Sequence, residues 1–181
     1  MLRNKKKTLI EWKKKENRLP LILLGARQVG KTYLLQEFGK EFYRDYLYIN
    51  FEQEPQMRSL FEKDLKTERI ISELELIYMK KIDINQTLII FDEIQFEMKA
   101  ITALKYFAEA SKKYHIIGAG SLLGVALNRD EFSFPVGKVE MHYLFPFTFD
   151  EFLRGIGEEL FLTKIKEAFF EDKALPQVVH E

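Results

Sequence analysis

The sequence predicts an α/β fold in which helices cover both faces of a mostly parallel five-stranded sheet. Short apolar runs of strand length alternate with longer amphipathic segments along most of the 181 residues. The runs at 20–24 and 87–92 are almost continuously apolar, which is typical of strands covered on both faces. A glycine-containing loop follows the first run, and a carboxylate ends the second. Ligands bind open α/β sheets at the edge where the strands end, so both features are expected at one site.

The elements follow in order along the chain. Strands are predicted at 20–24, 46–51, 87–92, 115–119 and 139–144. Helices are predicted at 6–15, 33–40, 57–81, 98–113 and 122–127, from 148 onward, and from 158 until the stretch 175–179 ends the last one. The long segment at 57–81 is expected to break near Lys66 or Thr67. Thr148 and Glu151 have the spacing of a capping box.

Composition limits the class of protein. The length allows one domain with a real core, and 46% hydrophobic residues exclude a disordered chain. The chain has no cysteine, no run of eighteen apolar residues and no leader with a cleavage site, so we expect a cytoplasmic protein without a membrane span.

Charge is uneven along the chain although the formal net charge is +0. That overall balance argues against a dedicated nucleic-acid-binding protein. Residues 1–20 nevertheless carry eight basic side chains against Glu11 and Glu16, a local charge of +6. The simpler interpretation is a solvated helix face. The alternative is a contact with a phosphate backbone or another partner.

The loop that follows the first strand has the composition of a phosphate-binding loop. Its glycines allow a tight turn with inward N–H groups, and the next helix adds the positive end of its dipole. Lys31 supplies a point charge, and Thr32 supplies a hydroxyl for the Mg²⁺ that accompanies the β and γ phosphates. The predicted nucleotide contacts are Gly25, Ala26, Arg27, Gln28, Val29, Gly30, Lys31, Thr32 and Tyr33.

A second motif ends the third predicted strand. Four apolar residues, 88–91, precede the adjacent carboxylates of Asp92 and Glu93, which is the form of a Walker B strand. Asp92 is predicted to hold Mg²⁺, and Glu93 to orient or deprotonate the water that attacks the γ phosphate. Lys31 and these two carboxylates form a minimum set for phosphoryl transfer.

Ser121 closes the fourth predicted strand. If this strand lies between the other two motif strands, the Ser121 hydroxyl faces the γ phosphate or the attacking water, the position called sensor 1. A helix N-cap is a competing role for the same hydroxyl, and the two roles are compatible.

The motifs resemble those of AAA-superfamily ATPases of the archaeal-type ATPase-like group. The likeness covers nearly the whole chain and is more specific than either nucleotide motif alone. It is carried by Gly-Ala-Arg-Gln-Val-Gly-Lys-Thr at 25–32, Phe-Asp-Glu-Ile-Gln at 91–95, Ala-Gly-Ser-Leu-Leu-Gly at 119–124, Phe-Pro-Val-Gly-Lys-Val-Glu at 134–140 and Phe-Pro-Phe-Thr-Phe-Asp-Glu-Phe-Leu at 145–153.

This resemblance implies a three-layer P-loop NTPase fold of the ASCE/AAA type, with strand order 5-1-4-3-2 and Mg²⁺-dependent hydrolysis of ATP to ADP and phosphate. The implied catalytic residues are Glu93, Lys31 and Ser121, with Thr32 and Asp92 on the metal. The expected units are a basic helical segment at 1–19 packed on the core, the P-loop ATPase domain at 20–156, and a helical segment at 157–181 that begins a further C-terminal domain. A lid and a sensor 2 arginine are then expected beyond this chain.

Several features stay open at this stage. AAA proteins often need an arginine finger from a neighbour, and the spacing favours none of Arg27, Arg129, Arg154 and Lys138. The ATP cycle could act on DNA or on a protein, with or without an ATP-dependent homo-oligomer. A nucleotide-gated binding module with little turnover is the alternative to an ATPase. A fragment of a helicase-like motor ranks lower, because such motors need a second lobe.

Overall fold

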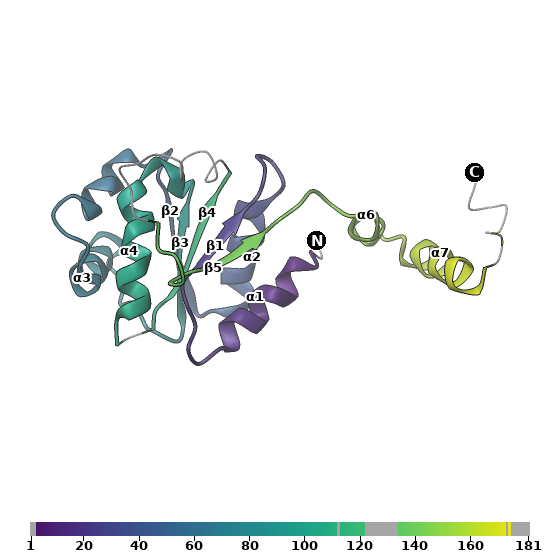
Figure 1. Cartoon of the computed structure of the whole chain (residues 1–181), viewed down its shortest axis with the longest axis horizontal. Helices are drawn as coiled ribbons and strands as arrows, with labels where there is room; N and C mark the ends of the chain where they lie inside the picture. The colour runs from purple at the N-terminus through teal and green to yellow at the C-terminus, as the bar shows by residue number, and fades with distance from the viewer. Residues whose placement is uncertain (1–2, 112, 122–133, 173, 175–181) are drawn as a thin grey trace.

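The computed structural model describes residues 3–111, 113–121, 134–172 and 174. The short helix predicted at 122–127 and the stretch at 175–179 lie outside the described residues, as does Arg129. Figure 1 shows a central sheet with helices on both sides, and a C-terminal arm that leads away from this body to α6 and α7.

The sheet confirms the predicted α/β class. Its strands are β1 (Leu21–Leu24), β2 (Asp45–Asn50), β3 (Thr87–Asp92), β4 (His115–Gly120) and β5 (Glu140–Tyr143). They lie in the order β2-β3-β4-β1-β5, and every pairing is parallel. This is the predicted order 5-1-4-3-2 counted from the other edge. The carboxyl ends of β1, β3 and β4 therefore lie side by side.

The helices agree with the amphipathic segments within a few residues. They are α1 (Lys5–Lys14), α2 (Lys31–Phe42), α3 (Thr67–Tyr78), α4 (Met98–Glu109), α6 (Phe149–Gly155) and α7 (Glu159–Glu171), with 3₁₀ turns η1 (Pro55–Phe61) and η2 (Ile94–Phe96). The predicted break in 57–81 is the gap between η1 and α3. It follows from Asp64, whose Oδ1 accepts hydrogen bonds from the Lys66 N–H at 3.0 Å and Arg69 Nε at 2.8 Å, making a local turn. The turn η2 is absent from the sequence prediction.

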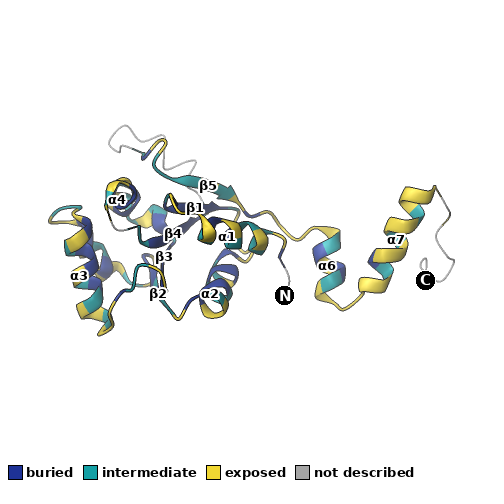
Figure 2. Ribbon diagram, turned by 90° about the horizontal axis from the view of Figure 1, so that it is seen from below, coloured by how far each residue is buried: buried dark blue, intermediate teal, exposed yellow. Residues whose placement is uncertain are grey.

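Two hydrophobic clusters occupy the two faces of the sheet. Alternate residues of β1 show why, since Ile22 and Leu24 belong to the cluster under η1, α3 and α4, whereas Leu21 and Leu23 belong to the cluster under α1 and α2. Trp12 of α1 is 1% exposed and anchors that helix on the second cluster. The result is three layers in which β1, β3 and β4 are buried on both faces (Figure 2). For β1 and β3 the continuous apolar runs predicted this.

The N-terminal segment contacts the start of the C-terminal arm. The predicted capping box is present, with the Thr148 side chain accepting from the Glu151 N–H at 3.2 Å. Glu151 is buried, and its Oε1 accepts from the Asn4 N–H at 2.7 Å and lies 3.5 Å from Arg3 Nε. Arg3 also donates to the Phe145 carbonyl. These contacts attach α6 to the residues before α1.

Helix α7 makes little contact with the body. Leu162 is its one buried residue, and Phe169 and Phe170 are each 81% exposed (Figure 2). In the part of the chain that the structure describes, no helix is both long enough and apolar enough to cross a bilayer.

His115, the first residue of β4, is buried among aromatic and basic side chains. Its Nδ1 lies 2.6 Å from the Tyr43 hydroxyl, and its ring meets Trp12 edge-on at 5.9 Å between centroids. Burial, together with the positive charges of Arg18 and Lys13, lowers the pKa of His115 to about 3. The imidazole is therefore neutral in the folded protein at physiological pH.

Acid should destabilise the protein through this histidine. Unfolding restores its ordinary pKa of about 6.5, so below that pH the unfolded state binds a proton that the folded state does not. The contribution of His115 to stability is complete above pH 6.5 and is lost as the pH falls toward 3. We expect the wild type to lose about 2 kcal/mol more than His115→Gln between pH 7 and pH 5, measured by urea unfolding. Equal losses in the two proteins would contradict this assignment.

Candidate functional site

The loop between β1 and α2 carries the first part of the site. Gly30 has φ 89° and Gln28 has φ 64°, both in the left-handed region. Only glycine adopts this conformation without cost, so Gly30 is required by backbone geometry. Gly30 precedes α2 directly, and its carbonyl accepts from the Leu34 N–H at 3.0 Å. The loop is thus bound to the helix whose N-terminus it presents.

Gly25 is required for a different reason, which is close approach. A Cβ at this position would lie 2.3 Å from the carbonyl oxygen of Leu144, and Leu144 is the residue directly after β5. The Leu144 N–H donates to the Leu24 carbonyl at 2.7 Å, so the chain after β5 runs along the start of the loop. There is room for a hydrogen atom and for nothing larger.

Lys31 occupies the centre of the loop and is 5% exposed. Its Nζ donates to the carbonyls of Gly25 at 2.9 Å and Ala26 at 2.8 Å. Burial lowers the pKa of Lys31, while the negative charges of Glu93 and Asp92 act in the opposite direction. The ammonium group is held by neutral carbonyls, so its positive charge is available to an anion in the loop.

Asp92 ends β3 and is fully buried, with each carboxylate oxygen hydrogen-bonded. Oδ2 accepts from Thr32 Oγ1 at 2.5 Å and from the Tyr48 hydroxyl at 2.8 Å. Oδ1 accepts from the Glu93 N–H at 2.9 Å. The Thr32 contact joins the two sequence motifs directly, across 60 residues of chain.

Tyr48 and Asn50 of β2 were missed by the sequence analysis. Asn50 Nδ2 donates to the Tyr48 hydroxyl at 3.3 Å, and that hydroxyl donates to Asp92. Burial is the main cause that raises the pKa of Tyr48 to about 12, so the hydroxyl keeps its proton and remains a donor. The signal was present in the alternation of the second strand, but it has meaning only once β2 is paired with β3, where Asn50 lies opposite Asp92.

Glu93 has φ 49°, a left-handed conformation that costs a non-glycine residue about 1–2 kcal/mol. Such an outlier is held in place by its surroundings. Here the Asp92 carboxylate accepts the Glu93 N–H, and the Glu93 carbonyl accepts from the Phe96 N–H at 3.0 Å. Gln95 Nε2 donates to Glu93 Oε2. The turn separates two adjacent carboxylates, so that Asp92 stays buried while Glu93 reaches a pocket.

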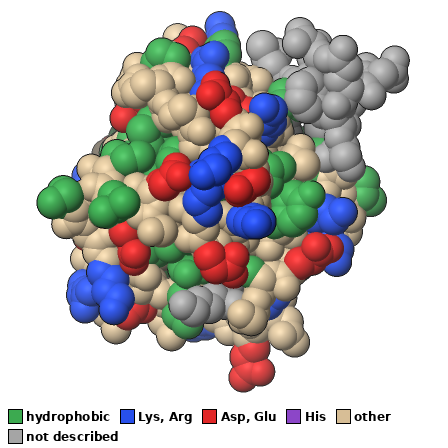
Figure 3. Space-filling view, turned by 90° about the vertical axis from the view of Figure 1, so that its left-hand side faces the viewer, with side chains coloured by type: hydrophobic (Ala, Val, Ile, Leu, Met, Phe, Trp, Pro, Cys, Tyr) green, Lys and Arg blue, Asp and Glu red, His purple; other side chains and the backbone are tan. Residues whose placement is uncertain are grey.

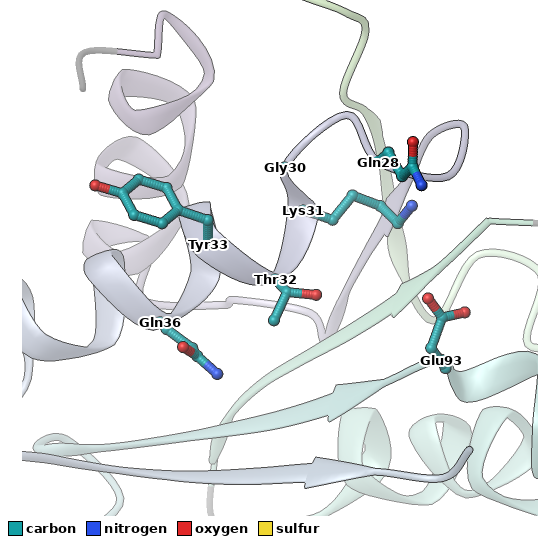
Figure 4. A pocket seen from close by; sticks show the side chains of 7 residues that line it. All are labelled: Gln28, Gly30, Lys31, Thr32, Tyr33, Gln36 and Glu93. Carbon is teal, nitrogen blue, oxygen red and sulfur yellow. The ribbon is translucent and has the colours of Figure 1, made fainter. Parts of the chain in front are cut away.

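This pocket has a volume of about 420 Å³ and gathers both motifs. It is lined by Gln28, Gly30, Lys31, Thr32, Tyr33, Gln36 and Glu93. Figure 4 shows Thr32 and Glu93 directed toward the space between them, with the Tyr33 ring pointing away. Tyr33 is 53% exposed. Val29 packs into the core below the loop.

Ser121 lies in a neighbouring cavity. Its Oγ is buried without a hydrogen-bond partner among the described residues. This cavity, of about 380 Å³, is lined by Leu24, Gly25, Ala26, Ser121, Tyr143, Leu144, Phe145 and Pro146. The two cavities share the loop as a wall, one using its first residues and the other its last. The structure therefore brings Ser121 to the loop but not to the surface shared by Lys31 and Glu93.

Two of the basic candidates for an arginine finger, Arg154 and Lys138, have partners within the chain. Arg154 contacts Asn4 Oδ1 at 3.0 Å and Asp150 Oδ2 at 3.7 Å, and Lys138 pairs with Glu109 at 3.0 Å. Arg27 is exposed within the loop itself.

A metal ion could be held at the junction of the motifs. Within the described residues, no group of three or more His, Cys, Asp or Glu side chains gathers as a metal cluster. Mg²⁺ in nucleotide sites takes one or two protein oxygens, waters and phosphate oxygens. The Thr32 hydroxyl and Asp92 carboxylate are oxygen donors of this kind, and they lie 2.5 Å apart. The donor set therefore fits Mg²⁺, with Thr32 facing the pocket and Asp92 behind it.

Comparison with known proteins agrees with this geometry. A protein-family model described as an AAA domain matches residues 17–153. No curated protein matches the chain by sequence.

Solved structures with the same fold are distant in sequence. The ORC1 protein of Aeropyrum pernix, solved in complex with DNA, gives a TM-score of 0.53 at 17% identity, over 88% of this chain and 50% of its own. Drosophila ORC bound to DNA gives 0.55 at 16% identity, over 90% of this chain and 47% of its own. At such identities the likeness shows the fold alone. The chain spans about half the length of these solved proteins.

Gly25→Ala should displace the loop. The added methyl group meets a backbone oxygen that cannot rotate away, and overpacking of this kind costs about 1–3 kcal/mol. We expect a lower urea midpoint and faster hydrogen exchange at the Leu144 amide. Gly137→Ala is the matched control, because Gly137 has φ 70° with nothing within 4 Å. It should lose stability without faster exchange at Leu144. Equal exchange in both variants would show that the contact is unimportant.

Proposed function

The chain belongs to the AAA domain family, and we propose that it binds ATP with Mg²⁺ and hydrolyses the γ-phosphate bond. The observation that carries the proposal is the 2.5 Å hydrogen bond between Thr32 of the loop and Asp92 of the second motif. With this contact, a phosphate cradle, a place for the metal and an outward carboxylate share one edge of the sheet. Phosphoryl transfer requires this combination of positioning and charge stabilisation.

Binding in this proposal depends on the loop and Lys31. The N–H groups at the start of α2 and the positive end of its dipole attract phosphate oxygens. Lys31 exchanges its two carbonyl contacts for the β and γ phosphates, an exchange favoured because both of these acceptors are neutral.

The metal would be held by Thr32, with Asp92 acting through the Thr32 hydroxyl or a bound water. Mg²⁺ supplies neutralisation of the charge that develops on the bridging and terminal phosphate oxygens. Tyr48 and Asn50 act one step further away. Their chain of hydrogen bonds fixes Asp92 Oδ2, so that its remaining acceptor capacity points toward Thr32.

Glu93 is the proposed general base. Its carboxylate faces the pocket that Lys31 and Thr32 line. It accepts a proton from the water that attacks the γ phosphate, and the Gln95 amide holds one of its oxygens in place. Ser121 is proposed as the sensor, since its unpartnered buried hydroxyl can donate to an oxygen that enters the adjoining cavity.

A nucleotide-gated binding module is the second candidate. It is favoured by the contacts that Arg154 and Lys138 make elsewhere, and by the absence of arginine from the described residues that line the phosphate pocket. We propose the ATP-binding unit at 20–156, with 1–19 and 157–181 as helical additions. DNA, a protein partner and ATP-dependent self-association remain proposed partners of the ATP cycle. Turnover should therefore be measured with and without each of them.

Substitutions in the pocket should separate binding from turnover. Lys31→Ala removes charge-assisted hydrogen bonds and should weaken ATP binding about 10- to 100-fold. Glu93→Gln keeps the shape but not the base, so it should bind ATP as the wild type does and hydrolyse it about 10²- to 10⁴-fold more slowly. Binding is measured by calorimetry, and hydrolysis by single-turnover assays with and without duplex DNA.

Lys63→Ala and Glu62→Gln are the matched controls, because both side chains are exposed outside the pocket. Each should behave as the wild type. A Glu93→Gln protein with unchanged turnover would remove Glu93 from the mechanism. Tight ATP binding with no hydrolysis in the wild type would favour the binding module.

A further inference from the structure

A third cavity opens at the opposite edge of the sheet, where the strands begin. It lies between the end of α1 and the start of β4, and its volume of about 480 Å³ exceeds that of the phosphate pocket. Its lining is Lys13, Lys14, Lys15, Glu16, Arg18, Ile84, Asn85, Ser111, Lys113 and His115. Five of these ten side chains are basic and one is acidic. The proposed ATPase mechanism uses none of them.

Main-chain carbonyls, rather than carboxylates, hold three of the five cations of this cavity. Arg18 donates through Nη1 to the carbonyls of Lys13 at 2.8 Å and Lys15 at 3.0 Å, and through Nη2 to that of Lys113 at 3.2 Å. Lys113 Nζ donates to the Ala108 carbonyl at 2.6 Å, and Lys13 Nζ to the Phe42 carbonyl. Arg18, Lys113 and Lys13 are therefore fixed in position while their charges stay unneutralised.

Ion pairing elsewhere on the surface shows the contrast. Figure 3 shows the face that carries α3, where basic side chains lie beside acidic ones. There Arg69 pairs with Asp64 and Glu73 at 2.8 and 2.9 Å, and Lys80 pairs with Asp45. Of the five basic side chains that line the cavity, only Lys15 forms an ion pair with a described residue, Glu140.

Arg18 is the most buried of these cations. It is 7% exposed, and its Nε is buried without a hydrogen-bond partner among the described residues. Burial lowers the pKa of Arg18 and of Lys13, and the charge of Arg18 lowers that of Lys13 further. The fold thus concentrates like charges in a partly desolvated cavity. A bound anion would offset the repulsion between these charges and replace part of their lost hydration.

We propose that this cavity binds a phosphate group, carried by a small molecule or by a nucleic-acid backbone. Arg18 and Lys113 form its inner wall, and Lys13 and Lys14 its rim. The basic run at residues 1–20 left two interpretations open, a solvated face or a phosphate contact. The fold favours the second, because α1 places part of that run around a hollow together with Lys113, which is distant in sequence.

The only tryptophan of the chain provides a reporter. Trp12 is 1% exposed, and the Arg18 guanidinium carbon lies 5.7 Å from its ring centroid. Pyrophosphate is titrated while Trp12 fluorescence is followed, at constant ionic strength with chloride. The titration is made in the wild type and in Lys31→Ala, in which the phosphate loop is impaired. A saturable change of similar affinity in both proteins assigns the signal to the cavity between α1 and β4, whether or not the chain is an ATPase.

Charge-neutral variants then test the cavity. Lys13→Gln/Lys113→Gln removes two cations and should weaken pyrophosphate binding by at least about tenfold. Lys63→Gln/Lys99→Gln changes the net charge equally at exposed positions outside the cavity and should bind as the wild type does. Lys14→Gln serves as a second variant should the first fail to fold, since the exposed Lys14 side chain has no hydrogen bond or ion pair with the described residues that would need replacing.

Unlabelled duplex DNA is the competitor that identifies the source of the phosphate. Competition with pyrophosphate assigns the cavity to a nucleic-acid backbone, and its absence assigns it to a phosphorylated small molecule. The proposal is overturned by a wild type without a saturable signal, by a signal that vanishes in Lys31→Ala, or by equal weakening in both double variants.

Discussion

The hydrogen bond from Thr32 to Asp92 is the contact on which the candidate site depends. A carboxylate with no exposed surface is costly unless donors replace its water, and Asp92 has three such donors. Each comes from a different element, namely α2, β2 and the turn after β3. Satisfying one buried charge therefore fixes the helix that follows the loop, the edge strand and the backbone of Glu93. The Asp92 carboxylate thus holds the parts of the site together, because all three of its hydrogen-bond donors come from the protein.

The sequence was sufficient for the strands and for the convergence of the two motifs, because apolar runs, glycine spacing and terminal carboxylates are local signals. The strand order followed from the family resemblance instead. It was insufficient where a role exists only across strands. Tyr48 reads as one position of an alternating strand until β2 is paired with β3. The left-handed backbone conformation at Glu93 could not be predicted, because the residue is not a glycine and the contacts that hold it come from tertiary packing. The sequence analysis expected Ser121 to face the γ phosphate. In the structure Ser121 lies at the same edge of the sheet but lines the adjoining cavity.

The two edges of the sheet solve different electrostatic problems. At the edge where the strands end, two acidic residues lie near the lysine of the loop, and their negative charges oppose the lowering of its pKa by burial. At the edge where they begin, cations are fastened to carbonyl oxygens, and the buried histidine remains neutral beside them. Carbonyl dipoles can orient a cation without cancelling its charge. A chain with no formal net charge can therefore carry a locally basic hollow, which total composition does not reveal.

The close approach of Gly25 to Leu144 has a mechanical consequence. Residue 144 directly follows the edge strand β5 and begins the arm that leads to α6 and α7. It is tied by its N–H to the Leu24 carbonyl and leaves no clearance beside the first glycine of the loop. A displacement of the arm would therefore move residue 144 against Gly25 and so displace the loop, and a displacement of the loop would act on the arm through the same contact.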